Sequence, residues 1–373
     1  MSLLSLTVVG WLVITVACAW ALPRKAQPFG IVLCTAAFLG YFALPSLLIL
    51  TATSLLIFFL LKRNRVHGAA LVSAVGVISA IFIWFKLKGA APVRMTGAWY
   101  VMPLGLSYYS FRQIHYIFES YKRKLEDHTL SDYLCYLFFL PTIHVGPIHR
   151  FPEFLRDLRR RRWDPSNLSA GLERILYGYA KIVIVSNYLI AKQYNLMIVP
   201  YNQGHPYLYE YLRSLSHWMN LYFQFSGYSD IAIGFSLIMG FRIMENFNYP
   251  FLAENIVEYW QRWHLSLSSW CREYVYLPMA SLTRRPGLAV VAAMLVLGLW
   301  HEFSGRYLIW GLYNGVAIVL WHRFQALKER LPDWKNRWWR GSLRAASILL
   351  TVNFMLTSFS VANYIYRKIH TIL

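Results

Sequence analysis

The sequence predicts an all-α, polytopic membrane protein. Of its 373 residues, 57% are hydrophobic and only 14% are charged, and long apolar runs alternate with short basic clusters. The 37 Lys and Arg residues outnumber the 17 Asp and Glu residues, which gives a net charge of +20. Such an excess in an apolar chain is typical of loops that face anionic lipid. A soluble nucleic-acid-binding protein would be far more polar, so we expect no nucleic-acid partner.

The first third of the chain predicts four membrane spans. The apolar run that ends at Leu22 has no positive charge before it, which favours a retained first helix over a cleaved signal. Residues 29–61 are too many for one span, and Pro45 near their centre predicts a hairpin of two spans. Residues 68–85 form the fourth predicted span.

The basic clusters predict the orientation of these spans. Arg24 and Lys25 fall on the same side of the membrane as the cluster at 62–65, so the positive-inside rule puts the N-terminus outside the cytoplasm. Lys86, Lys88 and Arg94 depart from this alternation, which re-entrant or tilted segments would reconcile. The arginine-rich run 156–162 is interpreted as a solvated cytoplasmic loop that contacts lipid phosphate, in preference to the alternative of a binding site for an anionic cofactor.

The remaining sequence predicts further membrane segments around an irregular middle. Prolines and a glycine interrupt the apolar run at 131–151, and irregular backbone at membrane depth must line a cavity or be covered by protein. In the stretch 246–282, Trp260, Trp263, His264 and Leu267 recur at helical spacing, which predicts an interfacial helix. In total we expect about ten to eleven membrane segments, the later ones at 172–196, 208–225, 231–241, 288–300, 307–321 and 343–365.

The chemistry-bearing residues are few. Phosphate-binding loops, nucleophile elbows and zinc-protease motifs are absent from the sequence. His144 and His149 do not share a helical face, because Gly146 and Pro147 intervene, so we predict no metal site. Asp230, a carboxylate between apolar flanks, is expected to order a helix end.

His301 is the most informative residue. It closes an apolar run beside Glu302, and an ionisable group at the membrane boundary is costly unless it is paired. Its position alone leaves two readings open, a packing histidine and a general base that takes a proton from a hydroxyl. For His264, in the predicted interfacial helix, position alone favours packing.

Several blocks of this sequence resemble the membrane-bound O-acyltransferase (MBOAT) family. They run from about Trp84 to Asn314 and read MPLGLSYYSFRQIHY, FFLPTIHVGPIHRF, FQFSGYSDIAIGFSLIMGFRIMENFNYPF, EYWQRWHLSLSSWCREYVYLP and LGLWHEFSGRYLIWGLYNG. The resemblance is to the bacterial branch with alginate O-acetyltransferases and teichoic acid D-alanyl transfer proteins. It implies a ring of membrane segments with re-entrant and interfacial helices around a central tunnel. We expect a single domain, 1–373, with N-terminal spans 1–85, a core 86–325 and a C-terminal span 326–373, in the bacterial plasma membrane.

The resemblance also implies the site. His301 matches the family's catalytic histidine, and His264 matches a second histidine on the reaction path. The predicted substrate contacts are Arg262, Asn246, Asn248 and Tyr274. The chain departs from the family pattern at Glu302, where glycine is usual, and at Asn314, where histidine is frequent.

By this resemblance the protein moves an acyl group, acetyl in first place, from a cytoplasmic thioester to a hydroxyl outside. The expected co-substrate is acetyl-CoA or an acyl carrier protein, with no permanently bound cofactor. Expected partners are membrane lipid, an acceptor polysaccharide, an extracytoplasmic SGNH-like acyltransferase and a cytoplasmic carrier protein. D-alanyl transfer to teichoic acid is the alternative within the class.

Two other classes compete with this interpretation. A proton-coupled transporter would use the intramembrane histidine as a relay, but it predicts inverted halves and several intramembrane carboxylates, and the sequence displays neither. A structural scaffold that recruits the true transferase would need no reactive histidine.

Overall fold

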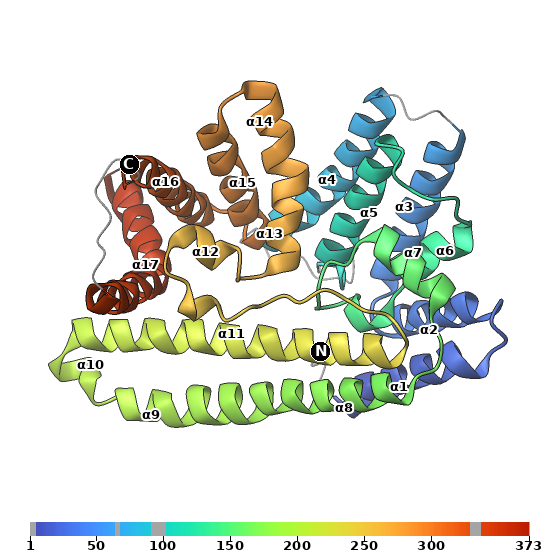
Figure 1. Cartoon of the computed structure of the whole chain (residues 1–373), viewed down its shortest axis with the longest axis horizontal. Helices are drawn as coiled ribbons and strands as arrows, with labels where there is room; N and C mark the ends of the chain where they lie inside the picture. Colours follow the sequence, from blue (N-terminus) through green and yellow to red (C-terminus); the bar gives the residue numbers. More distant parts are fainter. Residues whose placement is uncertain (1–4, 64–67, 91–101, 329–336, 373) are drawn as a thin grey trace. The chain divides into compact units, whose positions relative to one another are not determined.

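The computed structural model describes residues 5–63, 68–90, 102–328 and 337–372 (Figure 1). Across these ranges the secondary structure is helical, and no strand is formed beyond one isolated bridge between Phe247 and Trp263. The all-α prediction is confirmed. The chain divides into two compact units, residues 1–182 with 225–245, and residues 183–224 with 246–373. The predicted single domain, its internal boundaries and the ring around a tunnel stay predictions.

The apolar helices of the described residues indicate a membrane protein. In the described residues three helices are long and apolar enough to cross a bilayer, at Leu44–Leu61, Gly68–Leu87 and Gly341–Ile369. Only 17% of the second of these windows is buried, so most of its apolar side chains face outward. Shorter apolar helices are formed by Leu6–Ala21, Gln27–Phe42 and Pro286–His301. The total of ten to eleven segments stays a prediction.

The first unit contains the predicted hairpin, formed by α2 and α3. Helix α2 ends at Phe42 and α3 begins at Leu44, with Pro45 in its first turn, where a missing N–H costs nothing. The helices of this unit are α1 (Leu6–Ala21), α2 (Gln27–Phe42), α3 (Leu44–Arg63), α4 (Gly68–Ala90), α5 (Leu106–Tyr121), α6 (Leu130–Leu137), η1 (Leu140–Thr142), α7 (Phe151–Arg160) and α8 (Pro165–Tyr179).

The predicted orientation stays untested. The side chains of Lys62, Arg63 and Lys88, and the whole of Arg65 and Arg94, lie outside the described residues. The cluster at 62–65, with Arg24 and Lys25, carried the prediction of an outside N-terminus, and Lys88 and Arg94 departed from it.

The arginine-rich run is more ordered than the predicted loop. Most of it forms α7, an amphipathic helix that buries Phe151, Phe154, Leu155 and Leu158 and leaves Arg156, Arg159 and Arg160 exposed. Arg161 is buried instead of solvated. Its Nη1 donates to the Met239 carbonyl at 3.0 Å, and its guanidinium lies 5.0 Å from the Trp20 ring. The loop interpretation was therefore wrong for α7 and for Arg161.

A long helical hairpin follows. Helix α8 continues through the π-helical η2 (Ala180–Tyr194) and the short α9 (Asn195–Ile198) and α10 (Tyr201–Gly204) to α11 (Pro206–Ile238), which runs back alongside (Figure 1). The prediction of two segments, 208–225 and 231–241, was wrong, because α11 is one helix. A Cβ on Gly171 would lie 2.7 Å from the Gly234 carbonyl oxygen, and one on Gly178 would lie 2.6 Å from that of Gly227. Glycine at these positions lets the backbones touch.

Asp230 lies in this contact, not at a helix end as predicted. Its carboxylate is buried and accepts from Arg174 Nε at 2.7 Å and from Lys181 Nζ at 2.6 Å. Two cations from α8 and η2 therefore compensate one buried anion on α11, which removes the cost of burying it alone.

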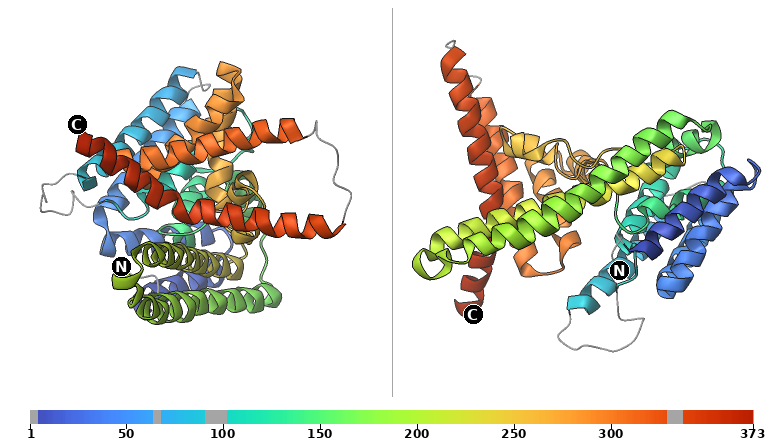
Figure 2. Two further views of the ribbon diagram at one scale, coloured as in Figure 1. Left: turned by 90° about the vertical axis from the view of Figure 1, so that its left-hand side faces the viewer. Right: turned by 90° about the horizontal axis from the view of Figure 1, so that it is seen from below.

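The second unit contains the C-terminal helices. Its α17 is a single long helix, drawn in red in Figure 2. Apart from η2 and α9–α11, the elements of this unit are η3 (Pro250–Leu252), α12 (Ile256–Trp260), α13 (Leu265–Cys271), η4 (Arg272–Tyr276), α14 (Leu277–Thr283), α15 (Pro286–His301), α16 (Gly305–Lys328) and α17 (Arg337–Ile372).

The predicted interfacial helix at 246–282 is broken. His264 adopts a left-handed conformation with φ of 46° and separates α12 from α13. The side chains of Trp260, Trp263 and Leu267 are buried, so they form a core instead of an exposed aromatic face.

Helices α15 and α16 pack backbone against backbone. A Cβ on Gly311 would lie 2.6 Å from the Met294 carbonyl oxygen, and one on Gly315 would lie 3.0 Å from the Val291 Cα. A Cβ on Gly298 would meet the Tyr307 carbonyl oxygen. Larger residues at these positions would push the helices apart.

The variant Gly311→Ala should lower the free energy of unfolding in detergent by about 1–3 kcal/mol, because the new methyl group meets rigid backbone. Thermal unfolding followed by tryptophan fluorescence would measure the change. Gly76→Ala on α4 is the matched control, since its Cβ would have no atom within 4 Å. Equal melting temperatures for the two variants would contradict the close packing.

Candidate active site

His301 emerges at the tight turn between α15 and α16. It is the last residue of α15, and the Glu302 amide still donates to the Gly298 carbonyl at 3.2 Å. The Ser304 amide donates to the Glu302 carbonyl at 2.9 Å, and α16 begins at the next residue. The imidazole is exposed and stands at the carbonyl end of a helix, where positive charge is stabilised.

Aromatic rings surround the imidazole. The centroid of the His301 ring lies 4.5 Å from that of Trp300, 5.8 Å from that of Tyr307 and 5.7 Å from that of Trp310. Tyr307 is nearly parallel to the imidazole, and Trp310 meets it edge-on. Phe359 of α17 stacks on Trp310 at 5.2 Å. The imidazole of His301 is therefore held in an aromatic setting.

His264 also contacts Trp300. Their ring centroids are 6.0 Å apart, so the two histidines share one indole as a neighbour. Unlike His301, His264 is buried. Burial, and to a smaller extent the nearby His301, lower the pKa of His264 to about 3. His264 is therefore a neutral imidazole near pH 7.

A small β-like pairing fixes the backbone of His264. The Leu265 amide donates to the Asn246 carbonyl at 2.9 Å, and the Asn248 amide donates to the Arg262 carbonyl at 2.9 Å. The Ser266 hydroxyl donates to Asn246 Oδ1 at 2.6 Å. These bonds hold the left-handed turn, which a residue other than glycine adopts only at a cost.

The predicted substrate contacts divide into three kinds of position. Asn246 is buried and supports the turn as described. Arg262 pairs with Glu258 at 2.6 Å and also donates to the carbonyl of the exposed Asn248 at 3.4 Å, so both belong to the same pairing. Tyr274 is buried in η4, against Trp270 at 5.3 Å. The structure therefore brings Asn246, Asn248 and Arg262 together around His264.

The two departures from the family pattern have local explanations. Glu302 forms an ion pair with Arg306 at 2.7 Å across the turn. Asn314 is buried, and its Nδ2 donates to the Trp310 carbonyl at 2.9 Å. Both residues therefore stabilise the segment that carries the aromatic rings.

Sequence reasoning missed the rings of Tyr307, Trp310 and Phe359. The sequence could have indicated Tyr307 and Trp310, because they follow His301 by six and nine residues in the block LGLWHEFSGRYLIWGLYNG, which resembles the family. Phe359 came from a remote apolar span and carried no local signal. A metal site finds no support in the described ranges, where no three His, Cys, Asp or Glu side chains gather closely enough to hold an ion.

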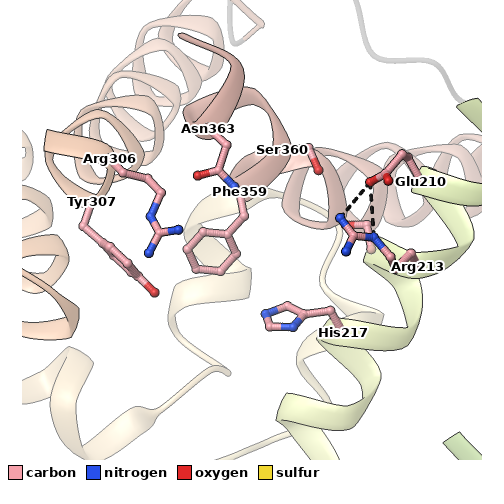
Figure 3. Close-up of a pocket in the computed structure, with 9 residues that line it drawn as sticks. Glu210, Arg213, His217, Arg306, Tyr307, Phe359, Ser360 and Asn363 are labelled. Carbon is pink, nitrogen blue, oxygen red and sulfur yellow. Dashed lines mark hydrogen bonds and ion pairs between the residues drawn. The ribbon is translucent and has the colours of Figure 1, made fainter. Parts of the chain in front are cut away.

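A pocket of about 360 Å³ adjoins this site (Figure 3). Tyr307 forms part of its wall and stacks on His301. The lining residues are Glu210, Arg213, Ser214 and His217 of α11, Arg306 and Tyr307 of α16, and Phe359, Ser360 and Asn363 of α17.

The fold and site define a helical membrane protein with paired histidines in an aromatic setting. The family model of the membrane-bound O-acyltransferase family matches residues 31–365. The chain belongs to this family.

The relatives include enzymes with different acyl groups and acceptors. A probable alginate O-acetylase AlgI of Pseudomonas aeruginosa is 34% identical over 224 residues, which are 59% of this chain and 42% of the relative. A teichoic acid D-alanyltransferase of Bacillus subtilis is 30% identical over 276 residues, 69% of this chain and 68% of the relative. A peptidoglycan O-acetyltransferase of Helicobacter pylori is 29% identical over 256 residues, 60% and 48% respectively. The chain spans about half the length of the alginate O-acetylases it matches.

The variant Asn246→Ala should destabilise the protein by about 1–3 kcal/mol, because the buried Ser266 hydroxyl loses its acceptor. Unfolding of Asn246→Ala, Ser266→Ala and the double variant would measure the coupling. We expect the double variant to be no less stable than Asn246→Ala. Fully additive losses would show that the two side chains do not act together.

Proposed function

We propose that this protein is a membrane O-acyltransferase that transfers an acyl group, acetyl in first place, from a cytoplasmic thioester to a hydroxyl of an exported polysaccharide or of a partner protein. Family membership supports the reaction class, and the acetyl-transferring relatives support the acyl group. The observation that carries the proposal is the position of His301. It ends α15 and contacts Trp300, an indole that His264 also contacts.

In the proposed mechanism His301 is the general base. The acceptor hydroxyl attacks the thioester carbonyl, and His301 takes the hydroxyl proton as the new C–O bond forms. The tetrahedral intermediate then collapses, the C–S bond breaks, and the imidazolium returns the proton to the leaving sulfur. The helix C-terminus and the surrounding rings stabilise the imidazolium between these steps.

His264 has a different role in this mechanism. As a neutral imidazole it cannot repel the cationic His301, and it offers one N–H donor for the charge that develops on the thioester oxygen. Arg262, Asn246 and Asn248 then act by positioning His264. Tyr274 is proposed to line the path by which the thioester donor enters.

The donor is acetyl-CoA or an acyl carrier protein, and no permanently bound cofactor takes part. We place the protein in the bacterial plasma membrane, with its N-terminus outside, among lipid, an acceptor polymer and an SGNH-like extracytoplasmic partner. D-alanyl transfer from a carrier protein is the second candidate, because a teichoic acid D-alanyltransferase aligns over 68% of its own length. Family membership favours a transferase over a transporter or a scaffold.

Purified protein in lipid nanodiscs should transfer label from acetyl-CoA faster than from D-alanyl carrier protein. His301→Ala should lower the rate by about 10²–10⁴-fold, because no other group replaces the base. Product ester formation would be followed by scintillation counting. His322→Ala, which replaces an exposed histidine on the following helix α16, is the control and should retain full activity.

The outcomes separate the candidates. Faster transfer from D-alanyl carrier protein than from acetyl-CoA would show that the acyl group is D-alanyl and not acetyl. Undiminished turnover by a correctly folded His301→Ala variant would remove the base assignment, and absence of transfer from either donor would refute the function.

The acid limb of the pH profile should have unit slope. A base acts in its neutral form, so log kcat/KM should rise with pH through the titration of His301 and then level off. His264 adds no second step, because its pKa of about 3 leaves it neutral over the whole range. Initial rates between roughly pH 5 and pH 8 would test this, and a slope of two would mean that both histidines titrate there.

A further inference from the structure

The pocket beside Tyr307 is lined mainly by residues that carry a polar group. Of its nine residues, all but Phe359 carry a hydroxyl, amide, imidazole, guanidinium or carboxylate group. In Figure 3 the Tyr307 hydroxyl, the Arg306 guanidinium and the His217 ring lie around the same space. A volume of about 360 Å³ is in the range of pockets that hold one small ligand or a unit of a polymer.

The charges of this pocket are balanced within the protein. Arg213 pairs with Glu210 at 3.0 Å, and Arg306 pairs with Glu302 at 2.7 Å. Each guanidinium therefore already has a carboxylate partner. An anionic ligand would have to displace a carboxylate or accept its repulsion, whereas a neutral ligand can use the remaining donors and acceptors of the lining residues Glu210, Arg213 and Arg306.

Flat rings complement these polar groups. Phe359 is held by Trp218, whose ring stacks on it at 5.3 Å, and His217 meets it edge-on at 6.1 Å. Tyr307 contacts Phe359 at 5.6 Å. Rings beside paired donors and acceptors suit a sugar, which has apolar C–H faces and a rim of adjacent hydroxyls.

The pocket is also close to the proposed base. The Tyr307 ring lines the pocket and stacks on the His301 imidazole with centroids 5.8 Å apart. A ligand in the pocket is therefore one aromatic ring away from His301.

We propose that this pocket binds an uncharged sugar residue of the acceptor and directs a neighbouring hydroxyl past Tyr307 to His301. The inference rests on the proposed function and adds the acceptor class, a neutral saccharide in place of a uronate or phosphate polymer. Sugar hydroxyls hydrogen-bond to Asn363, Ser360 and Glu210, and the C–H groups of the sugar pack against Tyr307 and the free edge of Phe359.

Acyl transfer to two tetrasaccharides of equal length tests the acceptor class, one a neutral β-glucan and the other a uronic acid oligomer. The full chain in nanodiscs is assayed with whichever thioester donor it turns over. The neutral oligomer should have a KM at least about tenfold lower, and this KM should change little with added salt, because no net charge is recruited.

Pocket variants test the site. Asn363→Leu should raise the KM for the neutral oligomer about tenfold, because it removes an amide and fills space. Tyr364→Leu, on the neighbouring exposed residue of α17, is the matched control and should leave that KM unchanged. The variant His217→Leu should also raise the KM.

The failures are distinguishable. If the wild-type protein turns over no donor, the proposed function itself fails. If His301-dependent transfer occurs but the uronate oligomer is preferred, or only a serine-bearing peptide is acylated, the saccharide pocket alone is wrong. Unchanged KM values in both pocket variants would also overturn it.

Discussion

The candidate site depends on the backbone contact between α15 and α16. Gly298, Gly311 and Gly315 lack the side chains that would separate the helices, so the turn at 302–304 stays short. That short turn brings Tyr307 and Trp310, in the first two turns of α16, back onto His301. In a membrane, where apolar surface is not driven together by water, such close packing is a main source of association between helices.

The two histidines differ because their surroundings differ. His301 stands exposed at a helix C-terminus among rings, a setting that tolerates a cation. His264 is buried in a strained turn, and burial keeps it neutral. One imidazole is therefore suited to gain and return a proton and the other to remain uncharged beside it, an electrostatic division that a pair in identical surroundings would not have.

The sequence predicted the helical class, the hairpin at Pro45 and the family, because composition, proline chemistry and family motifs are local signals. It failed where tertiary contacts decide. Asp230 was taken as a helix end because its partners Arg174 and Lys181 lie on another helix. The aromatic spacing around His264 implied one continuous helix, but the pairing of 246–248 with 262–265 breaks it. Phe359 could not have been placed at the site from its own neighbours in sequence.

The large positive net charge of the chain does not by itself favour an anionic acceptor. With 37 basic and 17 acidic residues, 20 positive charges would remain even if every acid neutralised one base. Near the site, however, carboxylates accompany the guanidiniums of Arg213, Arg262 and Arg306. Exposed arginines also lie on α7 of the first unit, an amphipathic helix of the kind that contacts lipid headgroups. A field that attracts anionic lipid and a charge-balanced pocket for an uncharged acceptor are therefore compatible in one chain, because net charge acts over the surface while recognition depends on local pairing.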